Sequence, residues 1–188
     1  IHLVFFINHF DFQPQSDDTL LFFGIIHNDK GVRQSIEISM VCNKKLILAG
    51  IIQDSAYYDQ YVAPHIDNDK VIYAGSVGPV ERNRLLGKAC ALLHPIQFDE
   101  PFGLSVIESM ACGTPVIAFD RGSMPELIEN GKSGFLVKNV DEAIDTVARI
   151  KEIDRANCRR HVERYFTVDR MINEYIQVYE MILDSERL

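Results

Sequence analysis

The 188-residue sequence has no tryptophan, only four cysteines and no surplus of basic residues. Its 19 Lys and Arg residues against 27 Asp and Glu residues give a formal net charge of -8. Nucleic-acid backbones are bound by dense basic surfaces, so this balance argues against a nucleic-acid partner. The cysteines are widely spaced, without a CxxC pair, which argues against a zinc site and predicts buried, reduced thiols and a cytoplasmic location. They are Cys42, Cys90, Cys112 and Cys158.

Long hydrophobic runs are also lacking. The most apolar stretch, residues 1–7, is too short to span a bilayer and has neither the basic flank nor the cleavage site of a signal peptide. Because the chain begins at Ile1, within this run, we expect it to be a piece of a longer protein. The hydrophobic fraction of 47% and the charged fraction of 24% are typical of a globular domain with a sizeable core.

Short runs rich in Val, Ile, Leu and Phe alternate with amphipathic stretches along most of the chain. This alternation predicts an α/β fold, in which a Rossmann-like, doubly wound parallel sheet of about six strands carries helices on both faces. The expected strands are Leu20–Phe23, Leu46–Ala49, Val71–Ala74, Ala91–His94, Val116–Phe119 and Phe135–Val137. The expected helices are Val32–Met40, Ser55–Ala63, Glu81–Lys88, Leu104–Ala111, Val140–Lys151 and Asp169–Leu183.

The pattern divides the chain into three parts. Residues 1–18 are expected to form a linker or first strand, residues 19–166 the Rossmann-like domain, and residues 167–188 a terminal amphipathic helix capped near Thr167. Ahead of that helix, four arginines at helical spacing predict a solvated helix face. They are Arg155, Arg159, Arg160 and Arg164.

The stretch from His94 to Ile117 carries the strongest chemical signal. A strand ends at His94, a loop follows, and a helix begins near Gly103 and ends at Gly113, a candidate left-handed C-cap. The amides of residues 103–105 would be free to bind an anion at the positive end of the helix dipole. Two carboxylates, Glu100 and Glu108, bracket that position and suit a ligand with phosphate in its middle and hydroxyl groups at both ends.

This stretch resembles the E-x7-E signature of family 4 (group 1) retaining glycosyltransferases, which have the two-domain GT-B fold. The match runs from Glu100 through Pro101-Phe102-Gly103-Leu104-Ser105-Val106-Ile107 to Glu108 and continues into Ser-Met-Ala-Cys-Gly-Thr-Pro-Val-Ile. Similar family-like segments occur in order along the chain: Asn8–Asp11, Phe23-Gly24 with Lys30-Gly31, Ala74–Val77, Gly122–Glu126 and Asn130–Val137. The resemblance covers only the carboxyl-terminal, donor-binding half of such an enzyme.

The resemblance implies a role for each matching residue. Glu100 would contact the transferred sugar, Glu108 the ribose, the amides at 103–105 the distal phosphate, and Lys30 the diphosphate leaving group. Val77 and Arg82 would lie near the base. No metal and no cofactor are expected, and the family's stereochemistry is retaining, with Glu100 positioning the sugar. The residues so assigned to the donor are Gly24, Lys30, Val77, Arg82, Glu100, Phe102, Gly103, Leu104, Ser105 and Glu108, with Lys30 and Glu100 as the catalytic candidates.

One departure from the family pattern leaves an alternative open. Ile25 stands where the family has an arginine, so Lys30 holds the diphosphate alone, another cation (Arg82 or Arg121) substitutes, or the chain is a degenerate, non-catalytic binding or scaffold domain. Losing one charge-assisted contact costs ~1.5–3 kcal/mol. Ser123 also replaces a family glycine, which we expect only to crowd a loop.

A dinucleotide oxidoreductase is disfavoured, because no Gly-x-Gly-x-x-Gly follows the first strand. A phosphorylase of similar fold remains open, although the cofactor lysine context that it needs is not seen.

Other candidates have simpler structural interpretations. His94 could bond a phosphate, but a structural histidine at a strand end is the preferred interpretation, and His27 is expected on a surface loop. Three tyrosines, Tyr57, Tyr58 and Tyr61, are expected to pack a groove. The predicted partners are a nucleotide-sugar donor and, through the missing half, a glycan, lipid or small-molecule acceptor, at the cytoplasmic membrane face if the acceptor is lipid-linked. Residues 1–7 and the terminal helix at 167–188 are where the missing half is expected to pack, and a homodimer formed through the same surfaces is also considered.

Overall fold

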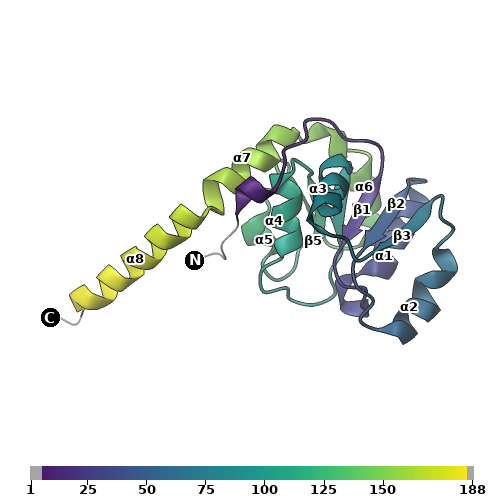
Figure 1. The fold of residues 1–188 in the computed structure, drawn as a ribbon, viewed down its shortest axis with the longest axis horizontal. Helices are drawn as coiled ribbons and strands as arrows, with labels where there is room; N and C mark the ends of the chain where they lie inside the picture. Colours follow the sequence, from purple (N-terminus) through teal and green to yellow (C-terminus); the bar gives the residue numbers. More distant parts are fainter. Residues whose placement is uncertain (1–5, 186–188) are drawn as a thin grey trace.

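The computed structural model describes residues 6–185, which form one six-stranded parallel sheet with helices around it (Figure 1). The strand order is β3-β2-β1-β4-β5-β6, and every neighbouring pair is parallel. This architecture confirms the predicted fold class. The strands are β1 (Leu20–Phe23), β2 (Leu46–Ala49), β3 (Val71–Gly75), β4 (Ala91–His94), β5 (Val116–Phe119) and β6 (Gly134–Val137).

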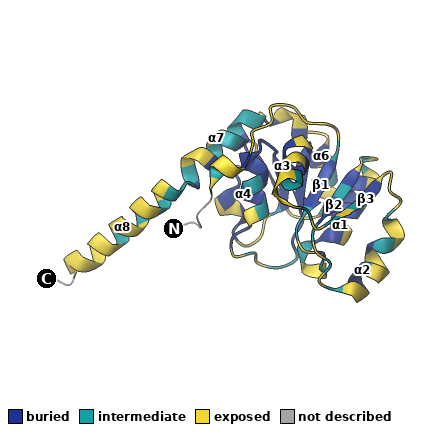
Figure 2. Ribbon diagram, in the orientation of Figure 1, coloured by how far each residue is buried: buried dark blue, intermediate teal, exposed yellow. Residues whose placement is uncertain are grey.

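Helices cover both faces of the sheet, which is why the central strands are apolar without alternation. α1 packs with α6, and α4 packs with α7 and α3, so the strands between these layers are buried (Figure 2). The helices are α1 (Val32–Val41), α2 (Ser55–Tyr61), α3 (Pro79–Lys88), α4 (Leu104–Ala111), α5 (Met124–Leu127), α6 (Val140–Val147), α7 (Arg155–Tyr165) and α8 (Val168–Ser185), with 3₁₀ turns η1 (Ile7–His9), η2 (Asn28–Lys30), η3 (Ala63–His65) and η4 (Ile150–Glu152).

The helix ends differ from the prediction where proline and capping residues act. α3 begins two residues earlier than expected, because Pro79 occupies its first turn, where a missing N–H costs nothing. The stretch predicted as a helix over 140–151 is interrupted, since α6 ends at Val147 and η4 follows. Gly113 adopts the expected left-handed conformation after α4, with a φ of 88°.

The segment before β1 lies against the domain (residues 10–19, here called the N-terminal strap). Its Gln13 amide donates to the Cys112 carbonyl at 3.0 Å, and its Asp17 amide donates to the Lys88 carbonyl at 2.9 Å. The Phe10 side chain is buried in the core. Whether residues 1–18 also link two domains stays a prediction, and residues 1–5 lie outside the described part of the chain.

The arginines of α7 hold this strap, so the predicted solvated face is wrong for two of the four. Arg155 donates to the carbonyl oxygens of Gln13, Ala89 and Gly87 and to the Thr114 hydroxyl at 2.6–2.9 Å. Arg159 donates to the carbonyls of Phe10 and Ala111 at 2.8 and 3.0 Å. Backbone carbonyls from distant parts of the sequence therefore accept the hydrogen bonds that water would otherwise accept. Arg160 and Arg164 are exposed, as expected.

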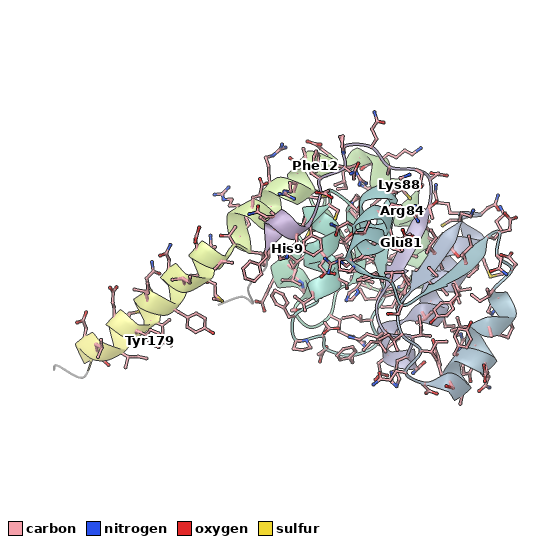
Figure 3. The ribbon with its side chains drawn as sticks, viewed as in Figure 1. His9, Phe12, Glu81, Arg84, Lys88 and Tyr179 are labelled. Carbon is pink, nitrogen blue, oxygen red and sulfur yellow. The ribbon has the colours of Figure 1, made fainter. Side chains whose placement is uncertain are left out.

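The terminal helix α8 projects from the domain as a single extended rod (Figure 1). None of its residues is buried, and Tyr179, for example, lies on this rod far from the sheet (Figure 3). Packing of α8 against a missing half stays a prediction, as does a homodimer through residues 1–7 and α8. Among residues 6–185, no helix combines the length and apolar character needed to cross a bilayer. The exposed apolar side chains of α8 include Ile172, Tyr175, Ile176, Tyr179, Met181, Ile182 and Leu183.

Candidate functional site

A cavity of about 530 Å³ opens at the carboxyl ends of β1 and β4. These strands are neighbours in the sheet although β2 and β3 separate them in the sequence. After β1 the chain continues to β2 and β3 on one side of this pair, and after β4 it continues to β5 and β6 on the other side. Ligands of open α/β sheets bind at such a switch point. The cavity is lined by Phe22, Phe23, Gly24, Ile25, Lys30, His94, Glu100, Pro101, Phe102, Gly103, Leu104, Ser105 and Glu108.

The amino-terminal end of α4 forms one wall of the cavity. Gly103 caps it with a φ of 99°, a left-handed conformation that glycine adopts without strain. The amides of Gly103, Leu104 and Ser105 meet no acceptor among residues 6–185, and no side chain caps the helix. A Cβ on Gly103 would stand 2.7 Å from Met124 Cε, so the turn is also tightly packed from behind. The unused amides make this wall suited to an anion.

The loop that carries Glu100 is held in place by the turn after β5. Gly122 has a φ of 57°, and a Cβ there would lie 2.5 Å from the Glu100 nitrogen. The Ser123 amide donates to the Glu100 carbonyl at 2.9 Å, and the Ser123 hydroxyl donates to the Phe102 carbonyl at 2.5 Å. The expectation that Ser123 merely crowds a loop is therefore wrong, because its hydroxyl ties the two loops together.

Lys30 and Glu100 meet inside the cavity. The Lys30 Nζ lies 2.5 Å from Glu100 Oε2, and their side chains are only 26% and 13% exposed. Lys30 ends η2, whose first turn is capped by the His27 ring accepting from the Asp29 amide. Nζ also lies 4.6 Å from the centre of the Phe98 ring. The two residues expected to act on opposite parts of a ligand thus neutralise each other in the free protein.

Glu108 forms the second ion pair of the site. Arg82 Nη1 lies 3.3 Å from Glu108 Oε1, and the Arg82 guanidinium stacks 4.3 Å from the centre of the Phe10 ring. Burial raises the pKa of Glu108, while the charge of Arg82 opposes that shift. Arg82 therefore connects Phe10 of the N-terminal strap with Glu108 of the cavity wall.

His94, at the end of β4, is a further lining residue. Its side chain is buried, and no described residue offers a hydrogen-bond partner to Nε2. Burial and then the nearby charge of Lys30 lower its pKa to about 3, so the imidazole is neutral near pH 7.

Most of the residues assigned to the donor from the sequence converge on this cavity. Gly24, Lys30, Glu100, Phe102, Gly103, Leu104, Ser105 and Glu108 all line it. Val77, half-buried after β3, and Arg82 are not among its lining residues. The sequence analysis gave no site role to the apolar wall at Phe22, Phe23 and Pro101, although Phe23 and Pro101 lie within family-like segments, and it missed the contact made by Ser123.

The remaining candidates are structural in this fold. His27 caps η2, and the Tyr57 hydroxyl accepts from the Arg33 amide at 3.2 Å. Tyr58 packs on Tyr73 with ring centres 5.4 Å apart. Arg121 donates to the Gln97 carbonyl at 2.6 Å. Within residues 6–185, no group of three or more His, Cys, Asp or Glu side chains is arranged to hold a metal ion.

These features define one Rossmann-like domain with an anion-suited cavity at its switch point. A family model described as glycosyl transferases group 1 matches residues 7–165, and the chain therefore belongs to that family. An uncharacterized 41.2 kDa protein from the cps region of Klebsiella pneumoniae is 31% identical over 168 residues, which is 86% of this chain and 46% of that protein.

Solved structures share the fold. AviGT4, a glycosyltransferase involved in avilamycin A biosynthesis, superposes with a TM-score of 0.82 at 25% identity, over 98% of this chain and 58% of that one. Anabaena Alr3699/HepE, solved in complex with UDP and glucose, superposes with a TM-score of 0.77 at 20% identity, over 94% of this chain and 55% of that one. The chain thus spans about half the length of these longer proteins.

Proposed function

We propose that this chain is the donor-binding, carboxyl-terminal half of a retaining glycosyltransferase that transfers a hexosyl group from a nucleoside-diphosphate sugar. The observation that carries the proposal is the arrangement around one cavity of the unused α4 amides, a cation at Lys30, and carboxylates at Glu100 and Glu108. Family membership and the similarity to a protein solved with UDP and glucose support it.

The cavity suits the charge pattern of such a donor. The amides at Gly103, Leu104 and Ser105 would hold the distal phosphate, and Lys30 would exchange Glu100 for the diphosphate. Cleaving the bond between sugar and phosphate leaves negative charge on the phosphate, and fixed donors can stabilise that charge without a metal. Glu100, released from Lys30, would then accept hydroxyl groups of the sugar, and Glu108 those of the ribose.

The test is a thermal-shift panel of UDP-, GDP- and ADP-sugars, followed by an NMR titration with the sugar nucleotide that stabilises the chain most. We expect one of them to raise the unfolding temperature, because a ligand that binds only the native state stabilises it. The largest amide shifts should fall on Gly103–Ser105. No stabilisation by any donor, or shifts confined to other segments, would contradict the proposal.

The second candidate function is a degenerate, non-catalytic nucleotide-sugar-binding or scaffold domain. The observation that favours it is Ile25, which is 40% exposed and lines the cavity where the family pattern has an arginine. Arg82 and Arg121 are both engaged elsewhere, with Glu108 and the Gln97 carbonyl. The variant Ile25→Arg should tighten donor binding about tenfold if the rest of the pocket is intact. An unchanged affinity would favour the scaffold function.

The half that the longer relatives have in addition would set the remaining properties. We infer that acceptor recognition, whether of a glycan, a lipid or a small molecule, belongs to it, and that the full enzyme works in the cytoplasm without a cofactor, at the membrane face if its acceptor is lipid-linked. The isolated chain should therefore bind the donor without transferring sugar. Radiolabelled donor incubated with the chain and candidate acceptors checks this, and turnover by the chain alone would refute it.

A further inference from the structure

The cavity wall contains a buried polar group that the fold itself does not use. His94 is 6% exposed, and its Nε2 has no hydrogen-bond partner among residues 6–185. A second shielded histidine, His161, also has one ring nitrogen, Nδ1, without a hydrogen-bond partner in the described part of the chain, but its Nε2 lies 2.9 Å from the Leu127 carbonyl oxygen and it does not line this cavity. Buried polar atoms of native proteins are nearly always paired, so an unpaired one at the wall of a cavity calls for an explanation.

The surroundings of His94 indicate what it would meet. It shares the cavity with Lys30, Glu100 and the amides at the start of α4. Arg82 and Val77, the residues expected near the nucleoside base, are not part of this lining. The same lining holds Glu108, expected at the ribose, but the charged group that acts on His94 is Lys30. A ligand group that reaches His94 is therefore placed at the diphosphate or the sugar, and not at the base.

The imidazole can serve such a group without adding charge. Because burial and Lys30 both disfavour its protonated form, the ring is neutral near pH 7, with one nitrogen able to donate and the other to accept. A neutral donor beside Lys30 avoids the repulsion that a second cation would introduce. It also meets an oxygen atom in a position shielded from water, where a hydrogen bond is stronger than in solvent.

We propose that His94 is a donor-binding residue, whose Nε2 forms a hydrogen bond with an oxygen atom at the diphosphate–sugar end of the nucleotide sugar. This inference rests on the proposed function. It assigns a ligand contact to His94, for which the sequence analysis preferred a purely structural role.

The experiment compares the wild-type chain with His94→Leu and His94→Gln by isothermal titration calorimetry. The probes are whichever of UDP-glucose, GDP-mannose and ADP-glucose binds the wild-type chain, together with its nucleoside diphosphate and monophosphate. His94→Leu should bind the nucleotide sugar about tenfold more weakly, the ratio for one net hydrogen bond. His94→Gln, whose amide reaches a similar point, should stay within about threefold of wild type. The monophosphate should bind all three proteins equally.

The diphosphate identifies the partner atom. If its affinity falls in His94→Leu as much as that of the nucleotide sugar, the oxygen belongs to a phosphate. If only the nucleotide sugar loses affinity, the oxygen belongs to a sugar hydroxyl. Both results support the proposal.

Stability measurements separate binding from a structural role. His94→Leu should unfold at the same urea concentration as wild type or at a higher one, because it removes an unpaired polar atom from the interior. The matched control, His161→Leu, loses a bond to the Leu127 carbonyl and should lower stability while leaving donor affinity unchanged. A fall in both stability and affinity in His94→Leu and His94→Gln alike would show a structural role and overturn the proposal.

The role of His94 and the proposed function can be refuted separately. If wild type binds a donor and His94→Leu binds it equally well, the role of His94 is refuted and the proposed function stands. If wild type binds no nucleotide sugar at all, the proposed function fails, and the inference about His94 fails with it.

Discussion

Removing the Arg155 guanidinium should destabilise the domain more than any exposed arginine does. Its four hydrogen bonds join α7 to the N-terminal strap through Gln13, to the end of α3 through Gly87 and Ala89, and to the Thr114 hydroxyl. These partners come from three separate parts of the sequence. The guanidinium thus holds α7, the N-terminal strap, the end of α3 and the turn at Thr114 together.

The magnitude follows from those contacts. Hydrogen bonds to a charged group are worth about 1.5–3 kcal/mol each, but they share one desolvated cation and do not add. Each buried acceptor that loses its donor costs about 1–3 kcal/mol, so the loss of the whole set of contacts is expected to cost about 3–5 kcal/mol. For Arg155→Met, which keeps an unbranched apolar stem but removes the guanidinium, we expect a loss of this size in the free energy of unfolding. With an m-value of about 2–3 kcal/mol/M, the urea midpoint falls by about 1–2.5 M.

The assay is urea unfolding followed by circular dichroism, with Arg160→Met as the matched control. Arg160 lies on the same helix but is exposed, and its partners Asp154 and Asn157 belong to its own helix end, so its loss should cost about 0.5 kcal/mol or less. This role of Arg155 is refuted if Arg155→Met lies within about 1 kcal/mol of wild type, or if the two variants are equally destabilised.

Three further outcomes follow from the site. Lys30→Met should weaken binding of the nucleoside-diphosphate sugar about 10- to 100-fold in calorimetry, because one charge-assisted contact is lost, whereas the exposed Lys132→Met should not. Ser123→Ala should lower the free energy of unfolding by about 1 kcal/mol in urea titrations, since the Phe102 carbonyl loses its donor; an unchanged midpoint would contradict the role given to that hydroxyl.

The third outcome concerns pH. His94 has a pKa of about 3 when folded and about 6.5 when unfolded, so only the unfolded state takes up its proton as the pH falls below 6.5. Stability from this residue is therefore present above pH 6.5 and is lost toward pH 3, by about 2 kcal/mol between pH 7 and pH 5. Urea midpoints of wild type and His94→Leu at these two pH values check it, and equal pH dependence in both proteins would refute it.

The sheet and the α4 wall were predictable from the sequence because local rules determine them. Strands such as Leu20–Phe23 are apolar on both faces, which indicates a sheet covered by helices on each side. Gly103 and Gly113 bound a short helix whose first amides have no partner within the helix, and glycine at the N-cap offers no side chain to cap them. The carboxyl ends of parallel strands then bring Gly24 and His94 to the same edge.

What the sequence could not predict depends on partners far along the chain. Arg155 and Arg160 cannot be told apart by residue type, but only Arg155 donates to the carbonyls of Gln13 and Gly87. Backbone acceptors are present at every residue, so the sequence does not show which of them an arginine will meet. The bond from Ser123 to Phe102 is hidden for the same reason. The pairing of Lys30 with Glu100 also joins residues 70 positions apart.

That last pairing bears on how a donor would be distinguished from its nucleotide. In the free protein, Lys30 and Glu100 neutralise each other across 2.5 Å, and Arg82 and Glu108 do so across 3.3 Å. On the proposed function, a diphosphate that takes Lys30 leaves Glu100 as an unpaired, largely buried carboxylate, which is costly. Hydroxyl groups of an attached sugar would relieve that cost by donating to it. A nucleotide that carries its sugar is then bound more favourably than the bare diphosphate, so the same ion pair would link recognition of the leaving group to recognition of the group transferred.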